Sequence, residues 1–167
     1  MGALVRWLVG AKRAEEAEEW YRRAAETDNP NGMVDLARWL AGAGQGQEAE
    51  EWYRRAAETG NPNAMWALAG WFVSVGRAQE AEKWYRRGAD TGNPKAMWAL
   101  ARWLAGAKRA EEAEEWYRRA AGTGNPNAML TLANWLADAG HADESEDWYR
   151  RAAEAGNPNV MRAWGAS

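Results

Sequence analysis

Residues 52–65, Trp52-Tyr53-Arg54-Arg55-Ala56-Ala57-Glu58-Thr59-Gly60-Asn61-Pro62-Asn63-Ala64-Met65, form a stretch that recurs almost letter for letter near residues 20, 84, 116 and 148. Every Pro and every Tyr of the chain recurs at a spacing of 32 residues. A fixed period of this size is typical of stacked helical repeats. We therefore read five units, 1–32, 33–64, 65–96, 97–128 and 129–160, with residues 161–167 as the start of a sixth.

The composition limits the classes of protein that the chain can represent. Repeats of this kind contact mainly their neighbours, so we expect residues 1–167 to form one elongated domain. The formal net charge of −3 gives no basic excess for binding nucleic acid. Cysteine is absent, which removes disulfides and thiolate chemistry and leaves the redox compartment undetermined.

The amino terminus and the hydropathy pattern predict a protein outside the membrane. The first residues are in register with the repeat and lack the long apolar run of a secretory signal. No stretch approaches the length of a membrane span. The default expectation is a cytoplasmic protein.

The unit 65–96 shows how each repeat is expected to fold. Asn61 and Pro62 suit the cap and the first position of a helix that ends just before Gly76. Apolar residues at 65, 68, 69 and 72 follow the spacing of one buried helical face. A second helix is expected from about Ala78 to Thr91, packing through its small residues and Tyr85. In unit 1, Asp28 stands where the other turns have Gly, so that turn is expected to be more strained.

The second helix of each unit carries acids first and bases last, an order that suits the helix dipole. In residues 111–121 we expect ion pairs at i, i+4 between Glu114 and Arg118, and between Glu115 and Arg119. Arg pairs recur in every unit, with Glu one turn before them. This pattern favours a solvated, ion-paired outer face over a surface that binds nucleic acid.

The pattern Ala49-x-x-Trp52-Tyr53-x-x-Ala56-Ala57-x-x-Gly60-x-x-x-Ala64-x-x-x-Leu68-Ala69-x-x-Phe72 resembles the Sel-one-like repeat, a relative of the tetratricopeptide repeat. The units here are shorter, and Ala follows Leu68 where that family favours Gly. The resemblance implies an all-α solenoid: a right-handed superhelix of antiparallel helix pairs whose first helices line a concave surface. It also implies a scaffold that holds other proteins.

The chain has thirteen Trp residues, of which ten follow the repeat as structural positions and three do not. Ten recur at positions 7 and 20 of the units, as expected of side chains that wedge between helices. Trp164 replaces a Leu of the core register. Trp66 and Trp98 share position 2 of consecutive units and lie outside the buried stripe. They either line the first-helix surface or pack against neighbouring helices.

Under the first alternative, the surface is an aromatic, weakly basic groove for an extended peptide. Trp and Arg are the residue types enriched at binding hot spots. Trp66 and Trp98 would be apolar anchors, and Arg38 and Arg102 would meet a carboxylate or the peptide backbone. The predicted binding residues are Arg38, Asn63, Trp66, Val73, Lys95, Trp98, Arg102 and Asn134.

Catalytic, metal and cofactor functions are not predicted. His141 is the only His and has no second His or Cys with which to bind a transition metal. The Glu pairs are expected to be exposed, so nothing raises their pKa toward catalytic use. We predict a non-catalytic scaffold that binds a protein or peptide. The alternative is a structural or engineered array, or a segment of a longer one, that self-associates end to end through residues 1–9 and 160–164.

Overall fold

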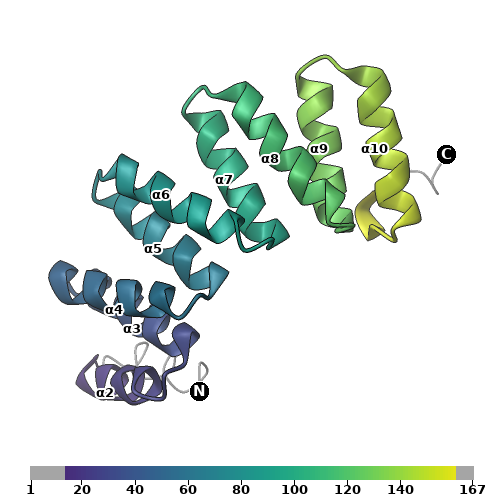
Figure 1. The fold of residues 1–167 in the computed structure, drawn as a ribbon. Helices are drawn as coiled ribbons and strands as arrows, with labels where there is room; N and C mark the ends of the chain where they lie inside the picture. The colour runs from purple at the N-terminus through teal and green to yellow at the C-terminus, as the bar shows by residue number, and fades with distance from the viewer. Residues whose placement is uncertain (1–13, 161–167) are drawn as a thin grey trace. The chain divides into compact units, whose positions relative to one another are not determined.

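The computed structural model describes residues 14–160, and within that range it contains helices and no strand (Figure 1). Connections of three or four residues separate consecutive helices, a length typical of helix hairpins. The helices are α2 (Ala14–Ala25), α3 (Pro30–Gly42), α4 (Gly46–Glu58), α5 (Pro62–Ser74), α6 (Ala78–Ala89), α7 (Pro94–Gly106), α8 (Ala110–Gly122), α9 (Pro126–Asp138) and α10 (Ala142–Glu154). The all-α, solenoid-type repeat fold is confirmed.

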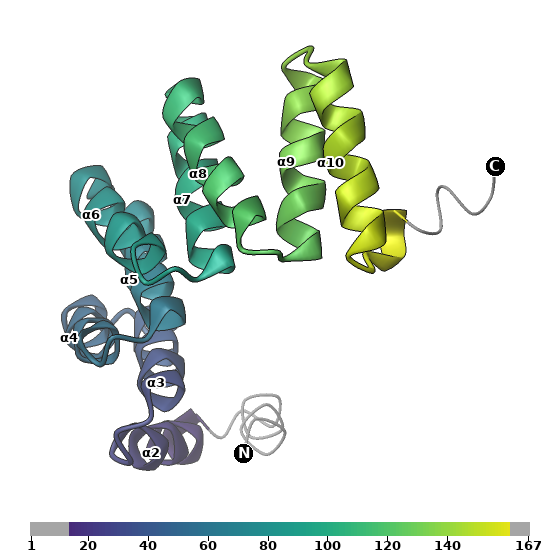
Figure 2. The ribbon, with the colours of Figure 1, turned by 45° about the vertical axis from the view of Figure 1, so that its right-hand side comes forward.

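The helices pack as hairpins, each made of a first helix that begins at Pro and a charged second helix. Figure 2 shows α9 and α10 side by side, and α3 with α4 and α7 with α8 pack in the same way. First helices of neighbouring hairpins also touch, α3 with α5 and α7 with α9. The chain divides into two compact units, residues 1–84 and 85–167, which we describe separately. A single domain over 1–167 stays a prediction.

The start of each first helix is fixed by its Asn-Pro pair, as predicted. The Asn61 side-chain oxygen accepts hydrogen bonds from the backbone N–H groups of Asn63 (2.9 Å) and Ala64 (3.2 Å), and Pro62 follows at the first helical turn. These bonds satisfy donors that a helix leaves without partners. Asn93 and Asn125 repeat the arrangement.

The turns need a residue in the left-handed conformation, and two of them lack Gly there. Gly76 ends α5 with φ of +76°, as expected. Asp28 has φ of +54° and Lys108 has φ of +60°. A side chain in this region is strained because its Cβ approaches the backbone. The strained turn expected at Asp28 is therefore present, and Lys108 forms a second one.

The core of each unit lies between the two helices of its hairpins. Leu36, Leu68 and Phe72 are fully buried in residues 1–84, and Leu100 and Leu132 are fully buried in residues 85–167. Their spacing is the predicted helical stripe.

Helix bounds agree with the sequence reading except that α6 ends at Ala89, two residues before the expected Thr91. Some predictions concern residues that the structure does not describe. These are the core role of Trp164, the partial sixth unit, and the apolar ends proposed for self-association, of which only Val160 lies within the described range.

Candidate functional site

In each of the two units, taken by itself, the exposed side of the first helices carries predicted binding residues, and we call this side the first-helix face of that unit. On α5, Trp66 is 51% exposed and Val73 is 41% exposed, and Asn63 is exposed beside them. Met65 and Leu68 of the same helix are buried. Trp66 and Val73 therefore expose apolar side chains on α5.

Trp98 of α7 occupies the same repeat position as Trp66 but has different surroundings. Its side chain is half-buried and packs against the core of residues 85–167. The guanidinium carbon of Arg102, one turn later, lies 4.8 Å from its ring centroid. The two Trp residues therefore differ: Trp66 is exposed, and Trp98 packs partly into the structure. A ligand-binding role for either residue stays a prediction.

The remaining predicted residues lie on the same helix face but differ in their partners. Arg38 of α3 is exposed and forms an ion pair with Asp35 at 3.1 Å. Lys95 and Arg102 are exposed on α7. Asn134 of α9 accepts a 2.5 Å hydrogen bond from the Tyr149 hydroxyl.

The eight predicted residues divide evenly between the two compact units. The unit 1–84 holds Arg38, Asn63, Trp66 and Val73, and the unit 85–167 holds Lys95, Trp98, Arg102 and Asn134. Within each unit, the residues project from consecutive first helices that contact each other.

Tyr–Trp pairs join each hairpin to the next and form a feature that sequence reasoning missed. Tyr53 of α4 and Trp71 of α5 stack with ring centroids 5.9 Å apart, and Tyr117 and Trp135 lie 5.2 Å apart. The signal was present as a constant Tyr-to-Trp spacing of 18 residues. Burial raises the pKa of the Tyr53 and Tyr117 hydroxyls.

The indole N–H groups of these Trp residues are unusual because they are buried without a hydrogen-bond partner in the described part of the chain. The indole N–H groups of Trp39, Trp71, Trp103 and Trp135 are buried and find no hydrogen-bond acceptor among the described residues. A buried donor without a partner costs stability. In each case the same Trp makes an aromatic contact with a Tyr, which contributes in the opposite direction.

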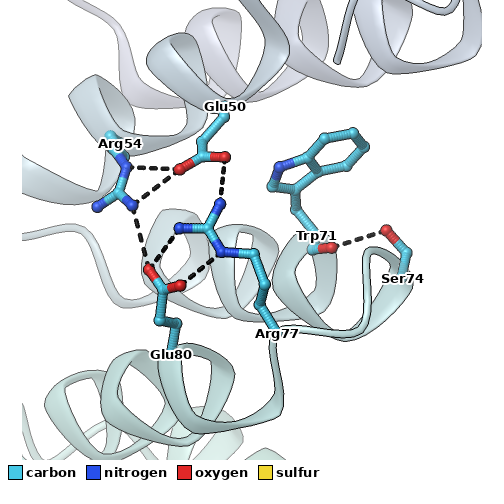
Figure 3. Close-up of polar contacts among 6 residues, drawn as sticks. All are labelled: Glu50, Arg54, Trp71, Ser74, Arg77 and Glu80. Atoms are coloured by element: carbon cyan, nitrogen blue, oxygen red, sulfur yellow. Dashed lines mark hydrogen bonds and ion pairs between the residues drawn. The ribbon is translucent and has the colours of Figure 1, made fainter. Parts of the chain in front are cut away.

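The outer face, formed by the second helices, carries Arg–Glu networks between hairpins (Figure 3). Arg54 of α4 contacts Glu50 at 2.8 Å and also reaches Glu80 of α6 at 3.3 Å. Arg77, just before α6, contacts Glu50 at 2.6 Å and Glu80 at 2.5 Å. Hydrogen bonds from Arg77, and then from Arg54, hold the pKa of the Glu80 carboxyl below its usual range.

Other hairpins repeat parts of this network. The contacts between second helices join Arg22 to Glu48 (2.6 Å), Arg86 to Glu112 (2.9 Å) and Arg118 to Glu144 (2.7 Å).

The predicted pairs on α8 are correct only in part. Arg118 contacts Glu114 at 2.9 Å as expected. Arg119 does not pair with Glu115, because its guanidinium lies over the Trp116 ring at 4.1 Å. The sequence reading considered spacings within one helix, and it missed both this stacking and the 26-residue spacing that joins successive second helices.

The described residues offer no group of acidic, His or Cys side chains arranged to hold a metal ion. His141 is exposed at the start of α10. Within residues 14–160, no helix combines the length and the apolarity needed to cross a membrane.

Comparisons with known proteins agree with this architecture. A family model described as "Tetratricopeptide repeat" matches residues 33–60. No curated protein matches the chain.

Several solved structures are similar over most of the chain. A Sel1 repeat protein from Oxalobacter formigenes is 26% identical with a TM-score of 0.61, and the match covers 92% of this chain and 69% of that one. A protective antigen of uropathogenic Escherichia coli with an SLR fold is 29% identical with a TM-score of 0.57, covering 90% of this chain and 36% of that one.

A third solved structure shows likeness of fold alone. YrrB, described as a tetratricopeptide-repeat protein with an unusual peptide-binding site, is 14% identical with a TM-score of 0.56, covering 98% and 89% of the two chains. The repeat period, the hairpin architecture and these similarities together support a tetratricopeptide/Sel1-like repeat protein.

Proposed function

We propose that this chain is a non-catalytic scaffold that binds an extended peptide segment of a partner protein along its first-helix face. The observation that carries the proposal is Trp66, an indole 51% exposed on an ordered helix of a repeat class that generally mediates protein interactions. The similarity in fold to YrrB, a protein with a peptide-binding site, also supports the proposal that this chain binds a peptide.

The chemistry of this face suits such a ligand. Trp66 and Val73 offer apolar contacts, and Asn63 offers an amide that can bond a peptide backbone. In the unit 85–167, taken by itself, Lys95 is exposed and has no acidic partner among the described contacts, and Arg102 is exposed over the Trp98 ring.

The experiment is a selection from a random-peptide phage library on the intact chain, followed by affinity measurements on the selected peptides. Trp66→Ala is expected to weaken binding at least tenfold, as expected for a hot-spot residue. Glu51→Ala, an exposed change on the outer face, is the matched control and should leave affinity unchanged. Peptides that bind the Trp66→Ala variant as tightly as the original chain would show that the ligand surface lies elsewhere.

A further inference from the structure

The repeat provides an internal comparison between two Trp residues at the same position. On a helix surface, the residue four positions later lies next to a given side chain. This comparison therefore turns on the residues that follow Trp66 of α5 and Trp98 of α7 by four positions. That neighbour is Arg102 for Trp98 and Gly70 for Trp66.

Arg102 shows what the indole face at this position can hold. Its guanidinium carbon is 4.8 Å from the centroid of the Trp98 ring. A guanidinium over an indole is attracted by the negative face of the ring, and Trp is the best of the aromatic partners for this contact. The chain thus supplies its own cation at this site in the unit 85–167.

The same place over Trp66 is open. Gly70 has no side chain, and a Cβ added there would meet nothing within 4 Å. Trp66 is 51% exposed, whereas Trp98 is partly covered by the core of residues 85–167 and by Arg102. No charged residue lies on α5, so the helix that presents Trp66 does not repel a cation.

The formal charge of the unit that contains Trp66 does not oppose a cationic partner. Residues 1–84 carry 13 acidic and ten basic side chains, whereas residues 85–167 carry 11 of each. The whole formal charge of −3 therefore belongs to the unit that contains Trp66. On the neighbouring first helix, α3, the charges of Arg38 and Asp35 offset each other in an ion pair.

From these observations we infer that Trp66 binds an arginine side chain of the partner peptide, in the place that Arg102 occupies over Trp98. The inference rests on the proposed function and deepens it by naming the chemistry of the partner. The two Trp residues then have different roles: Trp66 receives a guanidinium from outside, and Trp98 is already occupied by one from its own helix.

The test uses a single-arginine tripeptide, acetyl-Ala-Arg-Ala-amide, titrated into the ¹⁵N-labelled chain. The indole N–H resonance of Trp66 is assigned by comparison with Trp66→Phe, and its shift gives the affinity. The matched probe replaces arginine by citrulline, which has nearly the same shape and no charge. We expect citrulline to bind roughly threefold more weakly, the size of a partly exposed cation–π contact.

Two substitutions at one position supply the matched variants. Gly70→Arg reproduces at Trp66 the arrangement seen at Trp98. It should lower the affinity for the arginine peptide by roughly threefold or more, because the side chain of the variant then occupies the indole face. Gly70→Ala adds only a Cβ and should leave the affinity within about twofold, since that atom meets nothing. Circular dichroism confirms that both variants remain helical.

Equal affinity for the arginine and citrulline peptides, or equal weakening by Gly70→Ala and Gly70→Arg, would overturn the inference. Absence of any shift at Trp66 with the arginine peptide would overturn it as well. The broader proposal is judged separately by the phage-selected peptides: if these still require Trp66 but contain no arginine, the first-helix face binds peptides and the arginine assignment alone is wrong.

Discussion

The guanidinium of Arg102 covers the indole of Trp98, with 4.8 Å between the guanidinium carbon and the ring centroid. The equivalent indole, Trp66, has no such cover. This difference divides two residues that the repeat pattern alone treats as the same, and it predicts different responses to mutation.

Trp66→Ala should change stability little, and Trp98→Ala should change it more. Trp66 is half exposed, so its truncation should lower the free energy of unfolding by no more than about 1 kcal/mol. Trp98 packs against the core and under Arg102, so its truncation should cost roughly 1–3 kcal/mol. Urea unfolding of the two single variants gives both values. The opposite ranking would show that Trp66 is the structural residue of the pair.

Lys108→Gly should stabilise the chain by about 0.5–1 kcal/mol. Lys108 adopts φ of +60° at a turn where other units have Gly, for example Gly140 with φ of +84°. Glycine relieves the strain, although it also adds freedom to the unfolded chain. The reciprocal change, Gly140→Lys, should destabilise and serves as the control. A loss of stability in Lys108→Gly, measured by urea unfolding, would mean that the lysine side chain stabilises the turn.

Adding the missing Arg to the ion pairs between α2 and α4 should raise the stability of the chain. Gln45 stands where Arg77 stands one repeat later, beside a pair in which Arg22 contacts Glu48 at 2.6 Å. Gln45→Arg should raise Tm by about 1–2 °C, because a surface contact of this kind contributes only a fraction of 1 kcal/mol. Adding Glu48→Gln should abolish the gain. Thermal melts that show no gain in low salt would argue against the network.

Acid should weaken the chain through the carboxylates of these networks. Arg77 lowers the pKa of Glu80 from its ordinary 4.5, and Arg109, followed by Arg86, lowers that of Glu112. The folded chain then binds fewer protons than the unfolded chain at acid pH. This contribution is complete above the ordinary pKa and is lost as pH falls through the lower folded values.

Melting curves between about pH 7 and pH 2.5 test this expectation. Tm should begin to fall below about pH 4.5. Arg77→Gln should lower Tm at neutral pH. The Tm of this variant should also fall less steeply in acid, because the pKa of Glu80 then differs less between the folded and the unfolded chain. Parallel curves for the two proteins would show that Arg77 does not couple to the acid transition.

Much of the fold follows from local chemistry. The Asn61 cap, Pro62 at the first turn and Gly76 at the end determine where α5 lies, and these residues act on backbone groups only a few positions away. The second helix was placed correctly to within two residues for the same reason. The pair between Glu114 and Arg118 was also predictable, because both residues lie on one turn of one helix.

The partners of the long Arg side chains, both within a helix and between hairpins, could not be predicted as well. Arg119 turns to Trp116 rather than Glu115, and Arg118 reaches Glu144 of the next second helix. Both choices depend on which groups lie within reach of a long, flexible side chain once the helices have packed. The candidate site shows the same limit, since its residues were named from the sequence but their exposure and partners were not.

The sequence by itself determined the 32-residue repeat, the helix ends and the buried stripe, because capping and helical periodicity act between residues a few positions apart. Only the tertiary structure decided that Trp66 is open and Trp98 is covered, and that Glu50 and Glu80 share Arg54 and Arg77. Those outcomes depend on which side chains come within reach of one another after packing, and there α5 and α7 differ in the residue four positions after the Trp, which is Gly70 in one helix and Arg102 in the other.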